Sequence, residues 1–169
     1  MADLATKQIN ELEEQLQRRK KLQDITNRIH SAQNIKQILV DLKDGILNLF
    51  DAHSITIYIV DRIRNEIFSM FLSGSKLSEI RVPINNRSIA GYVANNGKIV
   101  NIADAYDEKE LRAIDKELSF DSSWDKKSGF RTRQILTAPI FHNGKLMGAV
   151  QILNKKSTVN GGRFSEDEK

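Results

Sequence analysis

The sequence contains no cysteine, only two prolines and a single tryptophan. The absence of cysteine excludes disulfides, thiol catalysis, cysteine-ligated zinc and a thioether-linked chromophore, and it is typical of a protein from a reducing compartment. No apolar run approaches the ~20 residues that a membrane-spanning helix needs, and the polar N-terminus does not have the form of a signal peptide. We therefore expect a cytoplasmic protein without a membrane span.

Charge of one sign is not in large excess either. The chain has 26 Lys and Arg against 22 Asp and Glu, and the two kinds are interleaved. This pattern favours solubility over a surface that binds nucleic acid. With 169 residues, 40% of them hydrophobic, the chain is long enough for one hydrophobic core and short for two full domains.

The N-terminal part predicts an amphipathic helix with a narrow apolar stripe. Apolar residues recur at steps of three and four, at Ile9, Leu12, Leu16, Leu22, Ile25, Ile29 and Ala32. A narrow stripe is typical of a helix that packs on a partner helix, whereas a helix that lies on a sheet has a wider apolar face. We therefore predict a coiled coil over residues 1–33 and a homodimer formed through it. The alternative is a helix that lies on its own domain.

The rest of the chain, residues 34–169, predicts one α+β domain. Asn34 is a suitable N-cap for a helix with a broad apolar face. Alternation of apolar residues then predicts strands over 54–60, 66–72, 79–84, 98–102, 134–142 and 145–153. Asn143-Gly144 predicts a two-residue hairpin turn. Helices are expected over 89–94, between Ser88 as N-cap and Gly97 as C-terminal glycine, and over 107–118. These elements indicate an antiparallel sheet in a three-layer α/β/α arrangement.

The C-terminal residues resemble the beginning of a helix that the sequence does not complete. Phe164-Ser165-Glu166-Asp167-Glu168 has the form of a cap and a first helical turn. We therefore expect a truncated C-terminal helix and a longer full-length protein.

A search for catalytic or metal-binding motifs finds none in the sequence. His30, His53 and His142 do not have metal-ligand spacing. There is no phosphate-binding glycine-rich motif and no nucleophile elbow. The sequence therefore supports neither an enzyme nor a metal site.

The segment 120–132 is unusual because it is polar and yet contains Trp124 and two phenylalanines. A long loop with aromatic residues usually packs over another part of the protein. It either buries these aromatics against the sheet or forms a lid. A lid facing the short helix that begins at Ser88, Ile89 and Ala90 would enclose a pocket, and the free amides of the helix would suit an anion or a polar ligand.

Several motifs, in order along the chain, resemble a GAF domain. They are Ser88–Gly97, Asn101–Tyr106, Ser128–Leu136, Pro139-Ile140, Gly148 and Gln151–Lys155. The resemblance covers roughly residues 35–169. Within the family, the motifs are most similar to the cyclic-nucleotide-binding type found in animal phosphodiesterases and some bacterial adenylate cyclases. It implies a six-stranded antiparallel sheet with a ligand pocket on one face. It also implies non-catalytic binding of a small molecule, a signal that leaves through the terminal helices, and an effector domain in the full-length protein.

The resemblance also implies roles for individual residues. The short helix, at Ser88, Ile89 and Ala90, would present backbone amides to a cyclic phosphate, and Phe71 would stack on the purine. The other ligand-binding candidates are Asp121, Trp124, Asp125, Ser128, Thr132 and Gln151. A structural clasp is implied at Asn154, Lys155, Phe164 and Asp167, with Lys155 paired to Asp167.

The sequence departs from the family pattern at positions that concern the ligand. Leu72 follows Phe71 where purine-reading members can have Asp, and Gln151 stands where some have Glu. A small-molecule sensor, with a cyclic nucleotide as ligand and no other cofactor, is the first hypothesis. The alternative is a dimerisation or scaffolding module with a vestigial pocket. Catalytic GAF folds such as free-methionine sulfoxide reductases need cysteines, and covalent bilin binding needs one as well.

Overall fold

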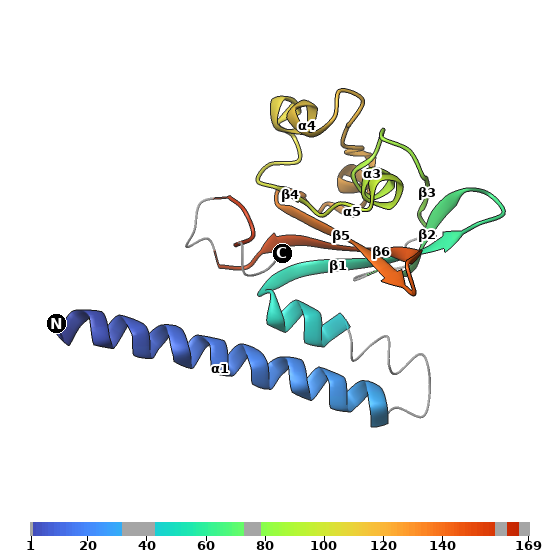
Figure 1. Ribbon diagram of the computed structural model, residues 1–169. Helices are drawn as coiled ribbons and strands as arrows, with labels where there is room; N and C mark the ends of the chain where they lie inside the picture. Colours follow the sequence, from blue (N-terminus) through green and yellow to red (C-terminus); the bar gives the residue numbers. More distant parts are fainter. Residues whose placement is uncertain (1, 32–42, 73–78, 158–161, 166–169) are drawn as a thin grey trace. The chain divides into compact units, whose positions relative to one another are not determined.

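The computed structural model describes residues 2–31, 43–72, 79–157 and 162–165 (Figure 1). The chain forms two compact units, Met1–Phe50 and Asp51–Lys169. The domain boundary predicted between residues 33 and 34 and the predicted cap Asn34 lie outside the described residues. Among the helices described, none is long and apolar enough to cross a membrane.

The first unit contains the long N-terminal helix that the apolar spacing predicts. Helix α1 (Ala2–Ser31) has 30 residues, and residues 43–49 are also helical. Four residues of the predicted stripe, Ile9, Leu12, Leu16 and Leu22, are exposed. Because exposed apolar residues on one helix face are unfavourable in water, this stripe is a feature that a partner helix would cover.

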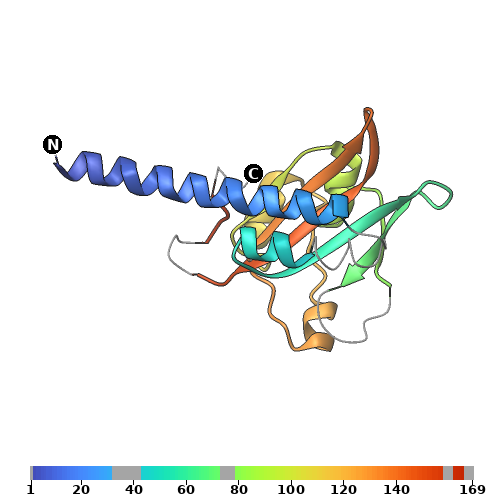
Figure 2. The same ribbon diagram turned by 90° about the horizontal axis from the view of Figure 1, so that it is seen from below.

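The second unit is built on a six-stranded antiparallel sheet, and this confirms the predicted fold class. Its strands are β1 (Ala52–Asp61), β2 (Glu66–Leu72), β3 (Arg81–Pro83), β4 (Val100–Ile102), β5 (Ile135–His142) and β6 (Lys145–Lys155). Their order is β3-β2-β1-β6-β5-β4, so that β1 and β6 lie at the centre. The tips of the β1–β2 and β5–β6 hairpins project beyond the sheet (Figure 2).

The hairpin turns and the alternation in β1 follow the sequence closely. Asn143 and Gly144 have φ angles of 49° and 72°, as the predicted two-residue turn requires. Strand β1 pairs Thr56 with Gln151 of β6, which in turn pairs with Thr137 of β5. Because directly opposed residues share a face, these three polar side chains form a row across the sheet.

Strand β3 is shorter than the predicted range 79–84. Its ladder with β2 extends from Glu66–Pro83 to Phe68–Arg81. At the next pair along the ladder, the Ser69 hydroxyl accepts a hydrogen bond from the Ile80 amide at 2.8 Å. The Ser69 amide still donates to the Ile80 carbonyl at 2.8 Å, but a side-chain oxygen replaces the strand carbonyl as the acceptor of the Ile80 amide, so the regular ladder ends there.

Helices from the middle of the chain, α3 (Ile89–Asn96), α4 (Glu108–Ile114) and α5 (Ser123–Ser128), lie on one face of the sheet (Figure 1). The caps predicted for α3 at Ser88 and Gly97 are confirmed, and the helix extends two residues beyond the predicted range 89–94. The Ser88 hydroxyl accepts from the Gly91 amide, and Gly97 ends the helix with φ 64°. A Cβ on Gly91 would lie 2.5 Å from the Pro83 carbonyl oxygen, so a glycine permits the close packing of α3 on β3.

Helix α4 differs from the predicted helix 107–118, which was too long. Asp107, predicted as the first helical residue, is the N-cap, and the helix ends at Ile114 with Asp115 extended. The Asp115 carboxylate accepts from the Asn86 amide at 2.8 Å, a contact with a distant segment. The turn that follows brings Leu118 into the core.

Helix α5 lies in a segment for which the sequence predicts a loop. No side-chain cap hydrogen bond stabilises its N-terminus at Ser122, and six residues are too few for a helix that is stable in isolation. Its stability therefore depends on tertiary contacts, which a local pattern does not contain.

Candidate functional site

A pocket of about 710 Å³ lies on the face of the sheet that these helices cover. Strands β1, β5 and β6 provide its floor, β3 and the start of α3 provide one wall, and residues 119–132 contribute the lid. This volume is within the range of small-molecule sites. The sequence had left open whether the segment 120–132 buries its own aromatic residues against the sheet or forms a lid. In the structure this segment lies over a hollow.

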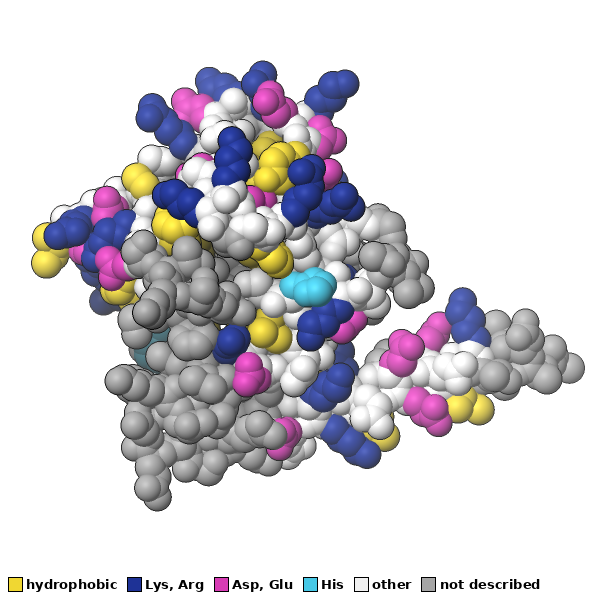
Figure 3. Space-filling model, turned by 180° about the vertical axis from the view of Figure 1, so that it is seen from behind, with side chains coloured by type: hydrophobic (Ala, Val, Ile, Leu, Met, Phe, Trp, Pro, Cys, Tyr) yellow, Lys and Arg dark blue, Asp and Glu magenta, His cyan; other side chains and the backbone are white. Residues whose placement is uncertain are grey.

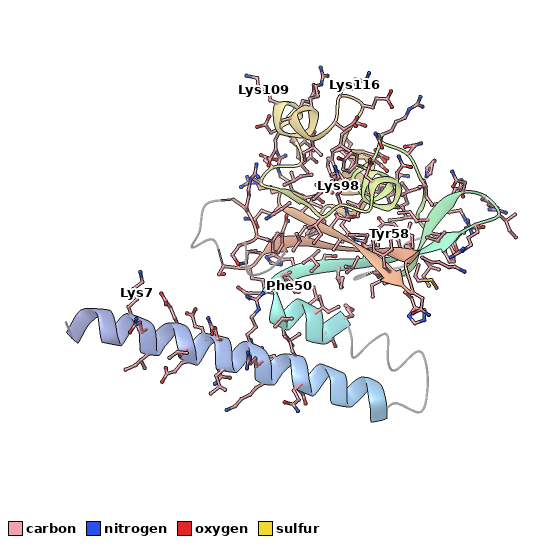
Figure 4. The ribbon with its side chains drawn as sticks, viewed as in Figure 1. Lys7, Phe50, Tyr58, Lys98, Lys109 and Lys116 are labelled. Atoms are coloured by element: carbon pink, nitrogen blue, oxygen red, sulfur yellow. The ribbon has the colours of Figure 1, made fainter. Side chains whose placement is uncertain are left out.

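The floor carries a chain of polar groups. The Tyr58 hydroxyl donates to Gln151 Oε1 at 3.5 Å, and Gln151 Nε2 donates to Thr137 Oγ1 at 3.3 Å. Tyr58 lies between the sheet and α3 (Figure 4). Burial raises the pKa of Tyr58 far above its usual value, so the phenol stays protonated and remains a donor at every physiological pH.

Thr56 adds a hydroxyl to this floor. Thr56 is only 5% exposed and lines the pocket. Within the described part of the chain its hydroxyl has no hydrogen-bond partner. A hydroxyl without a protein partner at the floor of a pocket can form a hydrogen bond with a ligand. Thr56 is thus ready to contact a ligand, whereas Ser88 is already engaged as the cap of α3.

The first turn of α3 forms one wall of the pocket. Ser88, Ile89 and Ala90 all line it, and Ser88 also forms a bridge to Ser119 of the lid. No group in the described residues accepts a hydrogen bond from the Ala90 amide. The second amide of α3 is therefore available where the helix dipole favours negative charge.

The lid is fastened by the Asp125 carboxylate. Asp125 Oδ2 accepts from the Tyr106 hydroxyl at 2.8 Å and from the Thr132 amide at 2.7 Å. Its Oδ1 accepts from the Thr132 hydroxyl at 2.7 Å. Asp125 is 9% and Thr132 4% exposed. The hydrogen bond to Asp125 raises the pKa of Tyr106. The carboxylate predicted as a ligand contact thus also holds the lid together.

Aromatic side chains make up much of the apolar lining. Tyr58, Phe120, Trp124 and Phe130 all line the pocket. Phe120 packs edge-on against Tyr106, with ring centroids 5.3 Å apart. Lys127 Nζ lies 4.9 Å from the Trp124 ring centroid. Flat aromatic surfaces of this kind suit a ligand with an aromatic ring.

Two arginines, Arg81 and Arg87, also line the pocket. Arg81 Nη1 lies 3.0 Å from Asp61 Oδ2 and 3.4 Å from Glu66 Oε2, and its Nε lies 2.6 Å from Glu79 Oε1. The hydrogen bond from Arg81 is the main reason that the pKa of Asp61 is lowered. Three carboxylates therefore surround the Arg81 guanidinium.

The structure brings eight of the ten predicted ligand-binding residues to this pocket. They are Ser88, Ile89, Ala90, Asp121, Trp124, Asp125, Thr132 and Gln151. The side chains of the other two, Phe71 and Ser128, lie outside the described residues. Phe71 pairs with Ile57 at a register shift between β1 and β2, and its stacking on a purine stays a prediction.

Several lining residues are absent from the predicted set. Thr56 and Tyr58 lie on the face of β1 opposite to Ile55, so the strand alternation contained the signal that could have found them. Phe120 and Phe130 are the two phenylalanines of the lid segment. Arg81 and Arg87 have no comparable signal, because the pairing of an arginine with carboxylates depends on the tertiary structure.

The predicted clasp is partly within the described residues. Asn154 Oδ1 accepts from the amides of Arg133 and Gln134 at 2.8 and 3.1 Å, and its Nδ2 donates to the Arg131 carbonyl at 2.7 Å. Asn154 therefore fastens the end of the lid to β6. Asp167 lies outside the described residues, and the pairing of Lys155 with Asp167 stays a prediction.

Phe164 is held by Asn101, which was not part of the predicted clasp. Its carbonyl accepts from Asn101 Nδ2 at 2.7 Å, and its amide donates to Asn101 Oδ1 at 3.3 Å. The ring is buried, with Lys155 Nζ 5.8 Å from its centroid. Asn101 thereby fixes the C-terminal segment to β4.

Charged side chains elsewhere show no grouping that suggests metal binding. In the part of the chain described, no cluster of three or more His, Asp or Glu could hold a metal ion. Basic and acidic side chains are interspersed on the face shown in Figure 3. Lys109 and Lys116 point away from the sheet (Figure 4).

Comparison with known proteins places this pocket in a family context. The family model described as "GAF domain" matches residues 34–169. The chain is 26% identical over 141 residues to "Probable 3′,5′-cyclic phosphodiesterase pde-5" of Caenorhabditis elegans, a match that covers 77% of this chain and 18% of the relative. It is 36% identical over 91 residues to "Dual 3′,5′-cyclic-AMP and -GMP phosphodiesterase 11A" of Takifugu rubripes, covering 53% of this chain and 9% of the relative. The chain thus spans less than a fifth of the length of these two relatives.

A solved structure supports the same fold. The GAF domain of a phosphoenolpyruvate-protein phosphotransferase from Coxiella burnetii superimposes with a TM-score of 0.71, at 21% identity, over 89% of this chain and 83% of that one. At this identity the similarity shows the fold and not the ligand.

Proposed function

Because the chain belongs to the GAF domain family, whose members are generally regulatory and not catalytic, we propose that it senses a small molecule. The ligand binds in the pocket under the lid, and the signal passes through the terminal helices to an effector domain. The observation that carries this proposal is the pocket of about 710 Å³, lined by aromatic rings and polar side chains. The absence of cysteine fits a cytoplasmic location for such a sensor.

The ligand class that best fits the lining is a 3′,5′-cyclic nucleotide. Such a ligand combines a flat base, which the aromatic side chains can contact, with a charged phosphate, which the first turn of α3 favours. Thr56 and Gln151 supply hydrogen-bonding groups on the floor. Two relatives whose names specify cyclic nucleotides as substrates add support from sequence.

Binding would act by shifting the equilibrium between lid conformations. Asp125, Tyr106 and Thr132 hold the lid closed through three hydrogen bonds. A ligand that contacts Trp124 and Thr132 in the closed form binds that form more tightly and increases its population. The end of the lid is bonded to Asn154 on β6, so the closed form also constrains the segment from which the chain leaves the domain.

Calorimetric titration with cyclic AMP and with cyclic GMP is expected to give saturable binding of at least one of them. Thr56→Val should weaken this binding about tenfold, because the isosteric change removes an unpartnered hydroxyl from the floor. Ser157→Ala, outside the pocket, is the control and should bind as the wild type does. No heat with either nucleotide at millimolar concentration would refute the nucleotide as ligand.

A second candidate function is dimerisation without a ligand, favoured by the exposed apolar residues of α1. Leu12 and Leu16 are 64% and 53% exposed, and a coiled-coil partner would cover them. In this reading the pocket is vestigial and the N-terminal helix performs the main function.

Deletion of residues 1–31 separates the two functions. We expect the truncated chain to be monomeric in analytical ultracentrifugation, while the full chain is dimeric, because the exposed stripe is removed. The sensor proposal also expects nucleotide affinity to survive this deletion, since every lining residue lies in the second unit. A full chain that sediments as a monomer would contradict the coiled coil.

A further inference from the structure

The two arginines at the pocket differ in how their charges are compensated. Arg81 has three carboxylate partners. Arg87 has none in the described part of the chain, and neither an ion pair nor a side-chain hydrogen bond satisfies its guanidinium there. Arg81 is therefore already neutralised within the protein, whereas the charge of Arg87 is available at the pocket.

The backbone of Arg87 is fixed although its side chain is unpaired. Its amide donates to Asn85 Oδ1 at 2.9 Å. Its carbonyl accepts from the Ser119 amide at 3.0 Å and from the Ser119 hydroxyl at 2.8 Å. These three hydrogen bonds, one with Asn85 and two with Ser119, hold the backbone of this exposed arginine at the rim of the pocket.

The carboxylates that line the pocket do not neutralise Arg87. Asp125 is occupied by Tyr106 and Thr132. Asp121 accepts from the Ser123 amide at 2.9 Å, and this bond is the main cause of its lowered pKa. Neither forms an ion pair with Arg87. A positive charge that the protein leaves uncompensated at a binding pocket attracts an anionic ligand.

We propose that Arg87 determines specificity in this pocket, by pairing with an oxyanion of the ligand so that a phosphate-bearing ligand is selected over its uncharged counterpart. The inference rests on the proposed sensing function and adds to it the residue that recognises the charge. Arginine suits this role because its planar guanidinium donates parallel N–H groups to two phosphate oxygens.

The test compares cyclic nucleotides with the corresponding nucleosides. Cyclic AMP, cyclic GMP, adenosine and guanosine are titrated into the wild type, Arg87→Gln, Arg87→Lys and Arg112→Gln. Arg112 is the matched control, since it lies on α4 outside the pocket lining and forms an ion pair with Glu108 on the surface. It loses the same formal charge.

The expected result is a change confined to the charged ligands. Arg87→Gln should weaken cyclic-nucleotide binding about tenfold, the effect of one charge-assisted hydrogen-bonded pair, and should leave nucleoside binding unchanged. Arg87→Lys should retain part of the affinity, and Arg112→Gln all of it. Equal affinity of wild type and Arg87→Gln for the cyclic nucleotide would overturn the inference and leave the proposed function intact.

Absence of nucleotide binding would refute the proposed nucleotide ligand. A second measurement tests the role of Arg87 even in that case. Trp124 is the single tryptophan of the chain and lines the pocket, so its fluorescence reports on ions there. Iodide, an anion, and acrylamide, a neutral quencher, are compared. An uncompensated Arg87 concentrates iodide, and Arg87→Gln should lower the ratio of iodide to acrylamide quenching constants. An unchanged ratio would overturn the inference.

Discussion

Replacement of Asp125 by alanine is expected to lower the free energy of unfolding by about 3 kcal/mol and to open the lid. Three hydrogen bonds end on this carboxylate, from the Tyr106 hydroxyl and from the Thr132 amide and hydroxyl. Thr132 is 4% exposed, so its groups would lose their partner without gaining full contact with water. Urea unfolding measures the stability, and hydrogen exchange at the Thr132 amide measures the lid.

Two milder variants separate the parts of this cluster. Tyr106→Phe removes one hydrogen bond and should cost about 1 kcal/mol. Asp125→Asn keeps an oxygen that can accept the Thr132 amide, and its stability should lie between those of wild type and Asp125→Ala. Nucleotide affinity should fall in the same order, because an open lid must first be closed at the expense of binding energy. A chain with Asp125→Ala that unfolds at the wild-type urea concentration would show that the carboxylate does not fasten the lid.

Gly148→Ala is expected to be the more damaging of two single-methyl substitutions in the β5–β6 hairpin. A Cβ on Gly148 would lie 1.9 Å from the Tyr58 carbonyl oxygen. The obstacle is the backbone of the central strand β1, with which Gly148 pairs through Ile59. Since a central strand cannot move away from its neighbour without breaking the ladder, we expect a loss of at least about 3 kcal/mol.

Gly144→Ala is the matched control for this steric effect. Nothing lies within 4 Å of a Cβ at Gly144, but its φ is 72°, so the cost is the roughly 1 kcal/mol of a left-handed alanine. Thermal unfolding followed by circular dichroism compares the two. The melting temperature of Gly144→Ala should fall by a few degrees, and Gly148→Ala should either melt far lower or fail to fold. Similar melting temperatures would contradict the close contact between β6 and β1.

The features that the sequence predicts well are those with a local cause. Alternation in β1, the Asn143-Gly144 turn and the cap at Ser88 each depend on a few consecutive residues. The end of α4 depends on Asn86, which contacts Asp115 from a distant part of the chain. Its position therefore could not be derived from the residues of the helix alone.

The site shows the same division between local pattern and tertiary arrangement. The resemblance to GAF domains identified eight of the residues that line the pocket, because the motifs keep their order along the chain. It did not indicate that Arg81 is neutralised while Arg87 is not. That difference arises because β1, β2 and residue 79 bring Asp61, Glu66 and Glu79 around one guanidinium.

Strand β6 carries three residues that have different structural roles. Gln151 belongs to the pocket floor, Asn154 fastens the lid, and Lys155 contacts the ring that anchors the final segment. Gln151 and Lys155 are four steps apart, about 13 Å at roughly 3.3 Å per residue. Under the proposed sensing function, this one strand connects the pocket floor directly to the segment that follows β6.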